Sequence, residues 1–138
     1  MPPARARNAY LASAVAAAPP ERLVTMLYDA LVNNIVHAEE AMERKDFYTK
    51  NEKLLKAQDI VLYLRETLKP EAWSAGPVLM DIYAYVYKLL VRGNVRNEPG
   101  CLSDARKLVE PLQQAWHGAA EKVLAEKAAK SASAAAVA

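Results

Sequence analysis

Residues 49–69 read TKNEKLLKAQDIVLYLRETLK, and apolar side chains recur in this stretch at spacings of three and four. That spacing indicates an α-helix, because a half-buried strand would alternate with a period of two. One row predicts the side that packs into a core: Leu54, Ala57, Ile60, Val61, Leu64 and Leu68. A second row, Tyr48, Leu55 and Leu62, recurs every seven residues on the opposite side and predicts an apolar line that faces outward.

The same spacing predicts three further helices over about 20–44, 77–92 and 102–128. The helix quoted above begins near Thr49, as part of a possible capping box, or slightly earlier at Asp46. It ends by Lys69 because Pro70 follows, and Pro77 suits the first position of the next helix.

Pro111 lies inside the last predicted helix and removes a backbone donor there. We therefore expect a kink at Pro111 or two shorter helices. The apolar spacing contains no strand signal, and four helices with short connections predict an all-α fold, an antiparallel up-down-up-down four-helix bundle.

Composition divides the chain into three parts. Residues 1–18 are small and rich in alanine and predict a mobile N-terminal arm, residues 19–128 form the bundle, and residues 129–138 form a disordered, frayed Ala/Ser tail. A single cysteine, Cys101, excludes an internal disulfide, and we find no signal sequence, so we expect a cytoplasmic protein. No stretch approaches the roughly 20 apolar residues of a membrane span, so no stable membrane insertion is expected.

The charge distribution argues against nucleic acid as a partner. Of the formal net charge of +2, Arg5 and Arg7 give residues 1–20 a charge of +2, and residues 118–138 add +1, which leaves −1 for residues 21–117. The charges of that body alternate in sign along its helices, as on solvated faces. A basic stripe that could neutralise phosphates is not visible.

Groups for catalysis or metal binding do not gather in the sequence. His37 and His117 lie on different helices without neighbours at metal-ligand spacing, and Cys101 has no evident base beside it. Four glycines form no phosphate-binding loop. We therefore expect no enzyme activity, no catalytic residues, no metal and no cofactor.

Apolar residues cover more of three helices than a core requires. Beyond the row on residues 49–69, Tyr28, Val32 and Val36 extend the apolar surface round the flank of the first helix. Met80, Tyr87 and Val91 lie at the margin of the third. Such a patch exceeds what soluble monomers usually expose, so a second copy of the chain, the N-terminal arm or an amphipathic client helix should cover it.

Several short motifs occur in the order and spacing of a known family. They are Tyr10, Leu23 with Met26-Leu27-Tyr28-Asp29, Asn51, Lys56-Ala57-Gln58-Asp59-Ile60 with Leu64, Ile82-Tyr83-Ala84-Tyr85, Asn94 and Ala115-Trp116. In these positions, over about residues 8–117, the chain resembles the flagellin-specific export chaperones of bacterial flagella, the FliS family.

The resemblance implies a four-helix bundle that binds the C-terminal helical segment of flagellin 1:1 in the cytoplasm. Such a chaperone prevents premature polymerisation and helps to deliver flagellin to the flagellar type III export gate. It also implies that Tyr10, in the arm, can cover a client groove. The candidate client-binding residues are Tyr10, Tyr28, Val32, Tyr48, Leu55, Gln58, Leu62, Met80, Tyr87 and Val91.

Two questions stay open at this level. The same apolar surface could form a homodimer of a structural bundle without a flagellin client, and an anti-sigma factor or another flagellar regulator could be an additional partner. The chain also departs from the family pattern: Ala30 stands where glycine is common, Gly93 stands where alanine is usual, Pro111 interrupts the last helix, and residues 70–77 are rich in Pro, Gly and Trp.

Overall fold

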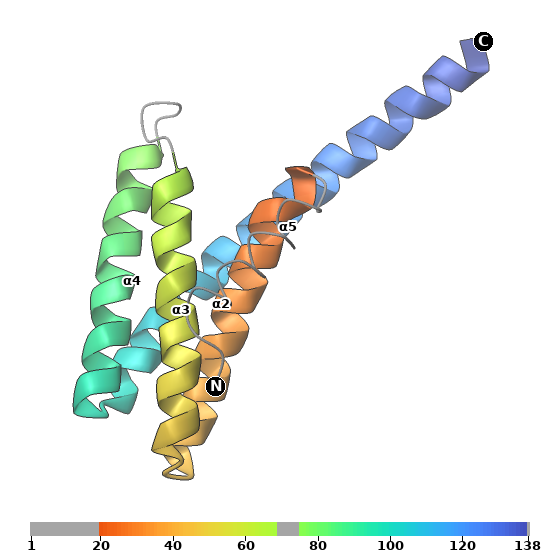
Figure 1. Ribbon diagram of the computed structural model, residues 1–138. Helices are drawn as coiled ribbons and strands as arrows, with labels where there is room; N and C mark the ends of the chain where they lie inside the picture. The colour runs from red at the N-terminus through yellow and green to blue at the C-terminus, as the bar shows by residue number, and fades with distance from the viewer. Residues whose placement is uncertain (1–19, 69–74, 138) are drawn as a thin grey trace.

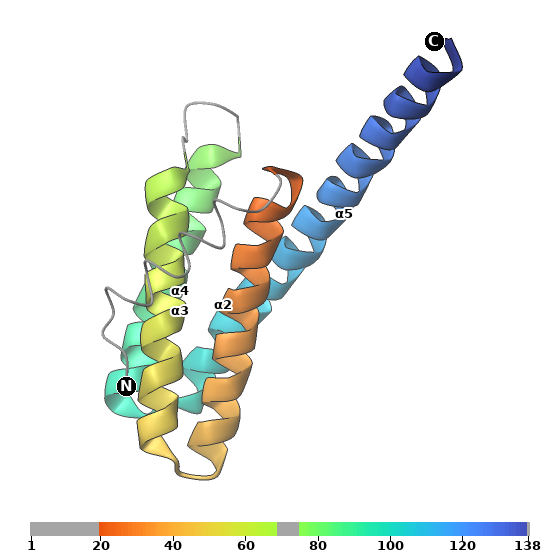
Figure 2. The same ribbon diagram turned by 45° about the vertical axis from the view of Figure 1, so that its right-hand side comes forward.

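A computed structural model describes residues 20–68 and 75–137, and these residues are almost entirely α-helical. The helices are α2 (Pro20–Glu43), α3 (Phe47–Thr67), α4 (Gly76–Arg96) and α5 (Pro99–Val137). Each helix packs against two others, in the cyclic order α2, α3, α4, α5, so α2 and α4 lie diagonally opposite. Successive helices alternate in direction (Figures 1 and 2), which confirms the predicted all-α antiparallel bundle.

The turn between α2 and α3 settles where α3 begins. Lys45 adopts a left-handed φ of 59°, which ends α2, and the carboxylate of Asp46 then accepts a hydrogen bond from the backbone N–H of Thr49 over 3.1 Å. Asp46 is therefore the N-cap, the earlier of the two predicted starts. Hydrogen bonds from the side chain of Thr49 and then from its backbone N–H are the main reasons that the pKa of Asp46 lies below its ordinary value.

Helix α4 runs through Gly93 to Arg96, so the expectation that it ends near Arg92 is wrong. The stop comes at Asn97, which adopts the left-handed conformation with φ 51° and donates its N–H to the carbonyl of Gly93. Gly93 has a packing role instead. A Cβ at this position would lie 2.8 Å from Cδ2 of Leu102, so the missing side chain lets α5 approach α4 closely.

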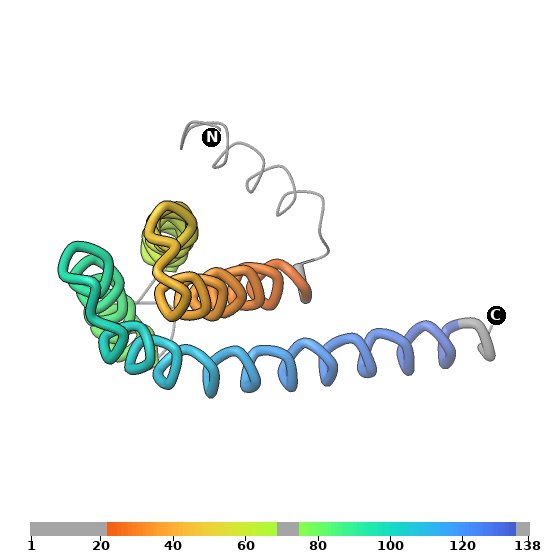
Figure 3. The backbone as a smooth tube through the Cα atoms, turned by 90° about the horizontal axis from the view of Figure 1, so that it is seen from below, coloured from red at the N-terminus to blue at the C-terminus, as the bar shows by residue number. Residues whose placement is uncertain are grey.

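Helix α5 is one uninterrupted helix of 39 residues that contains Pro111 (Figure 3). The expectation of two shorter helices is therefore wrong. Pro111 is exposed, so water can reach the carbonyl that its missing N–H leaves without a partner. Contacts to α2 on both sides of Pro111, described below, also hold the helix in place.

The end of α5 extends beyond the bundle (Figures 1 and 2), and the helix continues past Lys130, where the sequence predicts fraying. On α5 an apolar stripe starts at the buried Ala105 and Val109, but Ala115, Ala119 and Val123, further along the same stripe, are exposed. The stripe is buried only as far as α5 has neighbours. The division of the chain into arm, bundle and tail stays a prediction.

The core includes most of the inward row predicted for residues 49–69, since Leu54, Ala57, Ile60, Val61 and Leu64 are buried and Leu68 is half-buried. Its largest enclosed side chains include Leu27, Leu31, Ile35, Leu54, Val61, Val86, Leu90 and Leu102. Tyr28 also lies here: its hydroxyl is 2.6 Å from that of Tyr83, and the two rings come from the diagonally opposite helices α2 and α4. Trp116 of α5 completes the group, with its ring centroid 6.4 Å from that of Tyr28 and a side-chain hydrogen bond to it. Burial is the main reason that the pKa values of Tyr28 and Tyr83 lie above the ordinary value for tyrosine.

Candidate functional site

A polar contact sets the register between α3 and α4. The side-chain amide of Asn94 donates to the side-chain carbonyl of Asn51 over 2.9 Å. Next to it, the ammonium group of Lys50 donates to the backbone carbonyl of Asn94 over 2.9 Å and to the side-chain oxygen of Asn97. A cation is favourable at the carbonyl end of a helix, so Lys50 caps α4. Burial lowers the pKa of Lys50.

The asparagine pair identifies the sides of α3 and α4 that face each other. Tyr87 lies seven residues before Asn94 and Val91 lies three before it, so both occupy the flank of α4 that is next to α3. On α3, Leu55 and Leu62 follow Asn51 by four and eleven residues and occupy the corresponding flank. Antiparallel helices advance equally, so Leu55 lies level with Leu90, the neighbour of Val91, and Leu62 lies level with Tyr83.

We call this surface the α3–α4 face and define it by three residues from each helix: Tyr48, Leu55 and Leu62 of α3 and Met80, Tyr87 and Val91 of α4. Tyr48 is 64% exposed and Leu62 36%, and the other four are half-buried. These six were predicted from the sequence as candidate contacts, and the structure brings them to one side of the bundle. The outward direction of the row on α3 agrees with the exposure of Tyr48 and Leu62.

The remaining four candidates lie elsewhere. Gln58 is buried between the two rows of the α3–α4 face. Tyr28 has no exposed surface and Val32 only 8%, so their expected position on the flank of the first helix is wrong. Tyr28 is drawn inward by its hydrogen bonds to Tyr83 and Trp116, and Val32 is part of the same core. Tyr10 falls outside the described residues.

A shallow hollow of about 520 Å³ continues the face along the outer side of α4. It is lined by Tyr87, Lys88, Val91, Arg92, Val95 and Arg96. The sequence reasoning missed Val95 and the three cations, because charges at helical spacing were assigned to solvated faces. The signal that could have found them is the repetition of an apolar and a basic neighbour every four residues.

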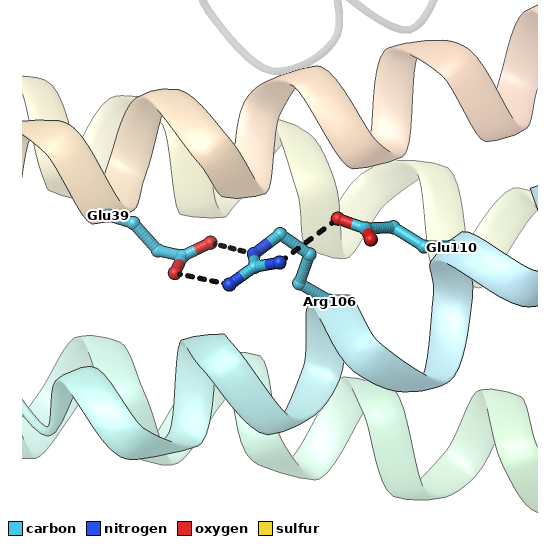
Figure 4. Close-up of polar contacts among 3 residues, drawn as sticks. All are labelled: Glu39, Arg106 and Glu110. Carbon is cyan, nitrogen blue, oxygen red and sulfur yellow. Dashed lines mark hydrogen bonds and ion pairs between the residues drawn. The ribbon is translucent and has the colours of Figure 1, made fainter.

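The opposite side of the bundle, where α5 packs on α2, is held by polar contacts (Figure 4). Arg106 of α5 donates from Nε to Oε1 of Glu39 over 2.7 Å and from Nη1 to Glu110 over 3.1 Å. These two carboxylates raise the pKa of Arg106. Beyond Pro111, Asp29 of α2 accepts from Gln113 over 2.8 Å and lies 2.7 Å from Nε2 of His117.

A second hollow, of about 350 Å³, lies further along this side, between the start of α2 and the part of α5 that leaves the bundle. Val24, Trp116 and Val123 are among its lining residues. The polar groups of this side join α2 to α5, so we interpret them as structural contacts between these two helices.

Within residues 20–68 and 75–137, no three His, Cys, Asp or Glu side chains gather as a metal site requires. Over the same ranges, no helix combines the length and apolar content that a membrane crossing needs. Cys101 is buried, and its thiol donates to Glu98 over 3.2 Å. The pKa of Cys101 is raised, chiefly by burial, which makes the thiol a weaker nucleophile.

The comparisons with known proteins agree with the motifs found in the sequence. The family model described as flagellar protein FliS matches residues 3–123. The chain belongs to the FliS family. It is 34% identical over 109 residues to the flagellar secretion chaperone FliS of Bacillus subtilis, a match that covers 79% of this chain and 81% of that protein.

Other FliS relatives lie at similar distances. The flagellar secretion chaperone FliS of Salmonella typhimurium is 31% identical over 108 residues, with 75% of this chain and 78% of that protein covered. The corresponding protein of Vibrio cholerae is 28% identical over 107 residues, with coverage of 75% and 77%. FliS is thus a family of flagellar secretion chaperones and not of enzymes.

Proposed function

We propose that this protein is a flagellar secretion chaperone that binds the C-terminal helical segment of flagellin 1:1 in the cytoplasm. Binding prevents premature polymerisation and assists delivery to the flagellar export gate. The observation that carries the proposal is the α3–α4 face, where six large side chains from two adjacent helices are exposed or half-buried. Membership of the FliS family supports the class of client.

The chemistry of the face suits a helix better than an extended chain. Leu55 and Leu62 on α3 and Tyr87 and Val91 on α4 repeat at helical spacing along two antiparallel axes. An amphipathic helix has apolar anchors at i, i+3, i+4 and i+7, and it can place them on such rows. A client segment that is disordered when free must be ordered on binding, so a large apolar contact is needed to offset the lost entropy.

The export gate is the second partner that this function requires, and an anti-sigma factor or another flagellar regulator is a third candidate. We assign neither to a surface. Tyr10 keeps its proposed role as a cover of the client surface, and Gln58 is a polar contact at the floor of the face. Tyr28 and Val32 are not proposed as contacts, since both lie in the core.

Co-purification with the flagellin of the same cell tests the client and the mode of binding. Full-length flagellin should be retained, and flagellin without its C-terminal helix should be lost. Light scattering should show a monomer that becomes a heterodimer when flagellin is added. A stable homodimer that does not respond to flagellin would contradict the proposal and favour the structural bundle.

A matched pair of variants tests the surface. Leu62→Asp places a charge on the α3–α4 face and should abolish binding while leaving helicity by circular dichroism unchanged. Val78→Asp makes a comparable change on α4 at a residue that is 60% exposed but lies about 160° round the helix from Asn94. Val78→Asp should bind as the wild type does. Loss of binding in both variants, or in neither, would refute the assignment of this face.

A further inference from the structure

The outer side of α4 carries two parallel rows of side chains. Tyr87, Val91 and Val95 form an apolar row, and Lys88, Arg92 and Arg96 form a basic row, each with a spacing of four residues. The rows run side by side for two helical turns, or about 12 Å. All six residues line the same hollow.

The hydrogen bond between Asn94 of α4 and Asn51 of α3 shows how the two rows lie relative to α3. Tyr87 and Val91 are on the flank next to α3, and each basic residue is one position further round α4, away from it. On the far side of the α3–α4 face, Glu52 and Asp59 of α3 lie outward of Leu55. In the half of the bundle that contains Asn51 and Asn94, the apolar surface therefore has a basic edge on α4. Its edge on α3 is mixed in charge, because Glu52 pairs with Lys56 over 3.4 Å.

Within the described residues, few carboxylates neutralise the basic edge. Lys88, Arg92 and Arg96 are exposed, and Arg92 donates to Glu98 over 3.1 Å. Arg96 lies near enough to Glu98 to help lower the pKa of that carboxyl, although the Cys101 thiol and Arg92 lower it more. Lys88 makes no ion pair in the part of the chain that the structure describes. Besides Glu98, the carboxylate along this side of α4 is that of Asp81, two turns before Lys88.

Val95 adds a second reason to expect a partner here. Its side chain is 76% exposed, the largest value among the exposed large apolar residues of the described chain, and it extends the row of Tyr87 and Val91 toward the C-terminal end of α4. Rows with a spacing of four residues on one helix accept the corresponding rows of another helix. A partner that covers Val95 in this way brings its neighbouring row within reach of the basic edge.

We propose that Lys88, Arg92 and Arg96 bind acidic side chains along one edge of the client helix whose apolar side chains lie on Tyr87, Val91 and Val95. This inference rests on the proposed function. It adds that charged side chains determine how the client helix is turned about its own axis on the bundle. A client helix turned the other way would place its acidic edge over Glu52, Lys56 and Asp59, where carboxylates and a cation alternate. The basic edge on α4 thus favours one orientation of an amphipathic helix over its reverse.

The test uses the full chain and a labelled peptide of the flagellin C-terminal segment, titrated by fluorescence anisotropy at about 0.1 M and about 1 M salt, where the screening length falls from about 10 Å to about 3 Å. Lys88→Glu reverses the cation that has no ion pair and gives Arg92 a neighbour of opposite charge. Lys107→Glu, on the exposed side of α5, changes the net charge by the same amount and is the matched control. Circular dichroism of each variant verifies folding.

Lys88→Glu should weaken binding at least fivefold at the lower salt concentration, because exposed ion pairs are worth up to about fivefold each and reversal adds repulsion. The difference from the wild type should shrink to less than about twofold at the higher concentration, where charges are screened. Lys107→Glu should stay within about twofold of the wild type throughout.

The outcomes separate the inference from the function on which it rests. If the wild-type chain does not bind the peptide, both the proposed function and this inference fail. If the wild type binds and Lys88→Glu matches it, or matches Lys107→Glu, the client surface stands and the basic edge has no part in it. An effect of Lys88→Glu that is the same at both salt concentrations would also overturn the inference, because an electrostatic contact must be screened.

Discussion

The hydroxyl groups of Tyr28 and Tyr83 lie 2.6 Å apart in the core and join α2 to α4, which lie diagonally opposite in the bundle. Trp116 hydrogen-bonds to the same hydroxyl of Tyr28 from α5. One oxygen atom thus links three helices. The free energy of unfolding should therefore depend on this atom more than on a surface hydroxyl.

Removing the hydroxyl in Tyr28→Phe should lower the free energy of unfolding by about 1–2 kcal/mol, since it leaves buried partners without a hydrogen bond. Tyr83→Phe should cost about 0.5–1.5 kcal/mol. The double variant should cost less than the two single changes together, and urea unfolding of the three variants measures that coupling. Tyr85→Phe, at a residue that is 52% exposed, is the control and should change stability by less than about 0.5 kcal/mol.

Alkaline pH should destabilise the protein through the same pair. Burial raises the pKa of Tyr28 and of Tyr83, so the unfolded chain loses these protons near pH 10 while the folded chain keeps them. The stabilisation is therefore complete below about pH 10 and is lost as the pH rises above it, with a slope of about 1.4 kcal/mol per pH unit for each group. Urea unfolding between about pH 8 and 11 should show a smaller slope for Tyr28→Phe than for the wild type; equal slopes would contradict this assignment.

The cap of α4 by Lys50 gives a second prediction. Lys50→Met keeps the apolar part of the side chain but removes the donor to Asn94 and Asn97, so the buried carbonyl loses its partner. We expect a loss of about 1–3 kcal/mol in the free energy of unfolding. Lys53→Met, one turn along α3 and only half-buried, should be close to neutral. Similar losses in the two variants would show that Lys50 contributes only as a long side chain.

Two glycines should respond to alanine in opposite directions. The Cβ that Gly118→Ala adds to α5 has no neighbouring side chain or helix within 4 Å. This substitution should therefore stabilise the protein by about 0.5–1 kcal/mol through the higher helix propensity of alanine. Gly93→Ala gains the same propensity but brings its Cβ to 2.8 Å from Leu102, which has no exposed surface and little room to move. Overpacking costs about 1–3 kcal/mol, so the net change at Gly93 should be destabilising. Thermal unfolding of both variants checks the sign of each change.

The sequence predicts the helices of this fold well, because their periodicity is a local property. It predicts the outward row of α3 for the same reason: Tyr48, Leu55 and Leu62 lie on one side of any regular helix that contains them. The end of α4 and the continuity of α5 could not be predicted in this way. Both depend on contacts across the bundle, from Lys50 to Asn94 and Asn97 at the end of α4 and from α2 to the two sides of Pro111.

In the candidate site, too, some features follow from local periodicity and others depend on contacts across the bundle. Tyr28 has a ring that suits a surface contact and a hydroxyl that suits water, and only the position of Tyr83, 55 residues away, shows that it is buried instead. The basic row of α4 was visible in the sequence as Lys88, Arg92 and Arg96, but its meaning depends on the side of α4 that faces α3. The contact between Asn51 and Asn94 identifies that side.

The length of α5 also affects how the molecule moves through solution. A helix of 39 residues is about 58 Å long at about 1.5 Å per residue, whereas the 24 residues of α2 span about 36 Å. The part that extends past the bundle adds friction but little mass to a chain of 15.2 kDa. The protein should therefore sediment more slowly, and elute earlier from a sizing column, than a compact sphere of its mass, so an early elution volume alone is not a sign of a dimer.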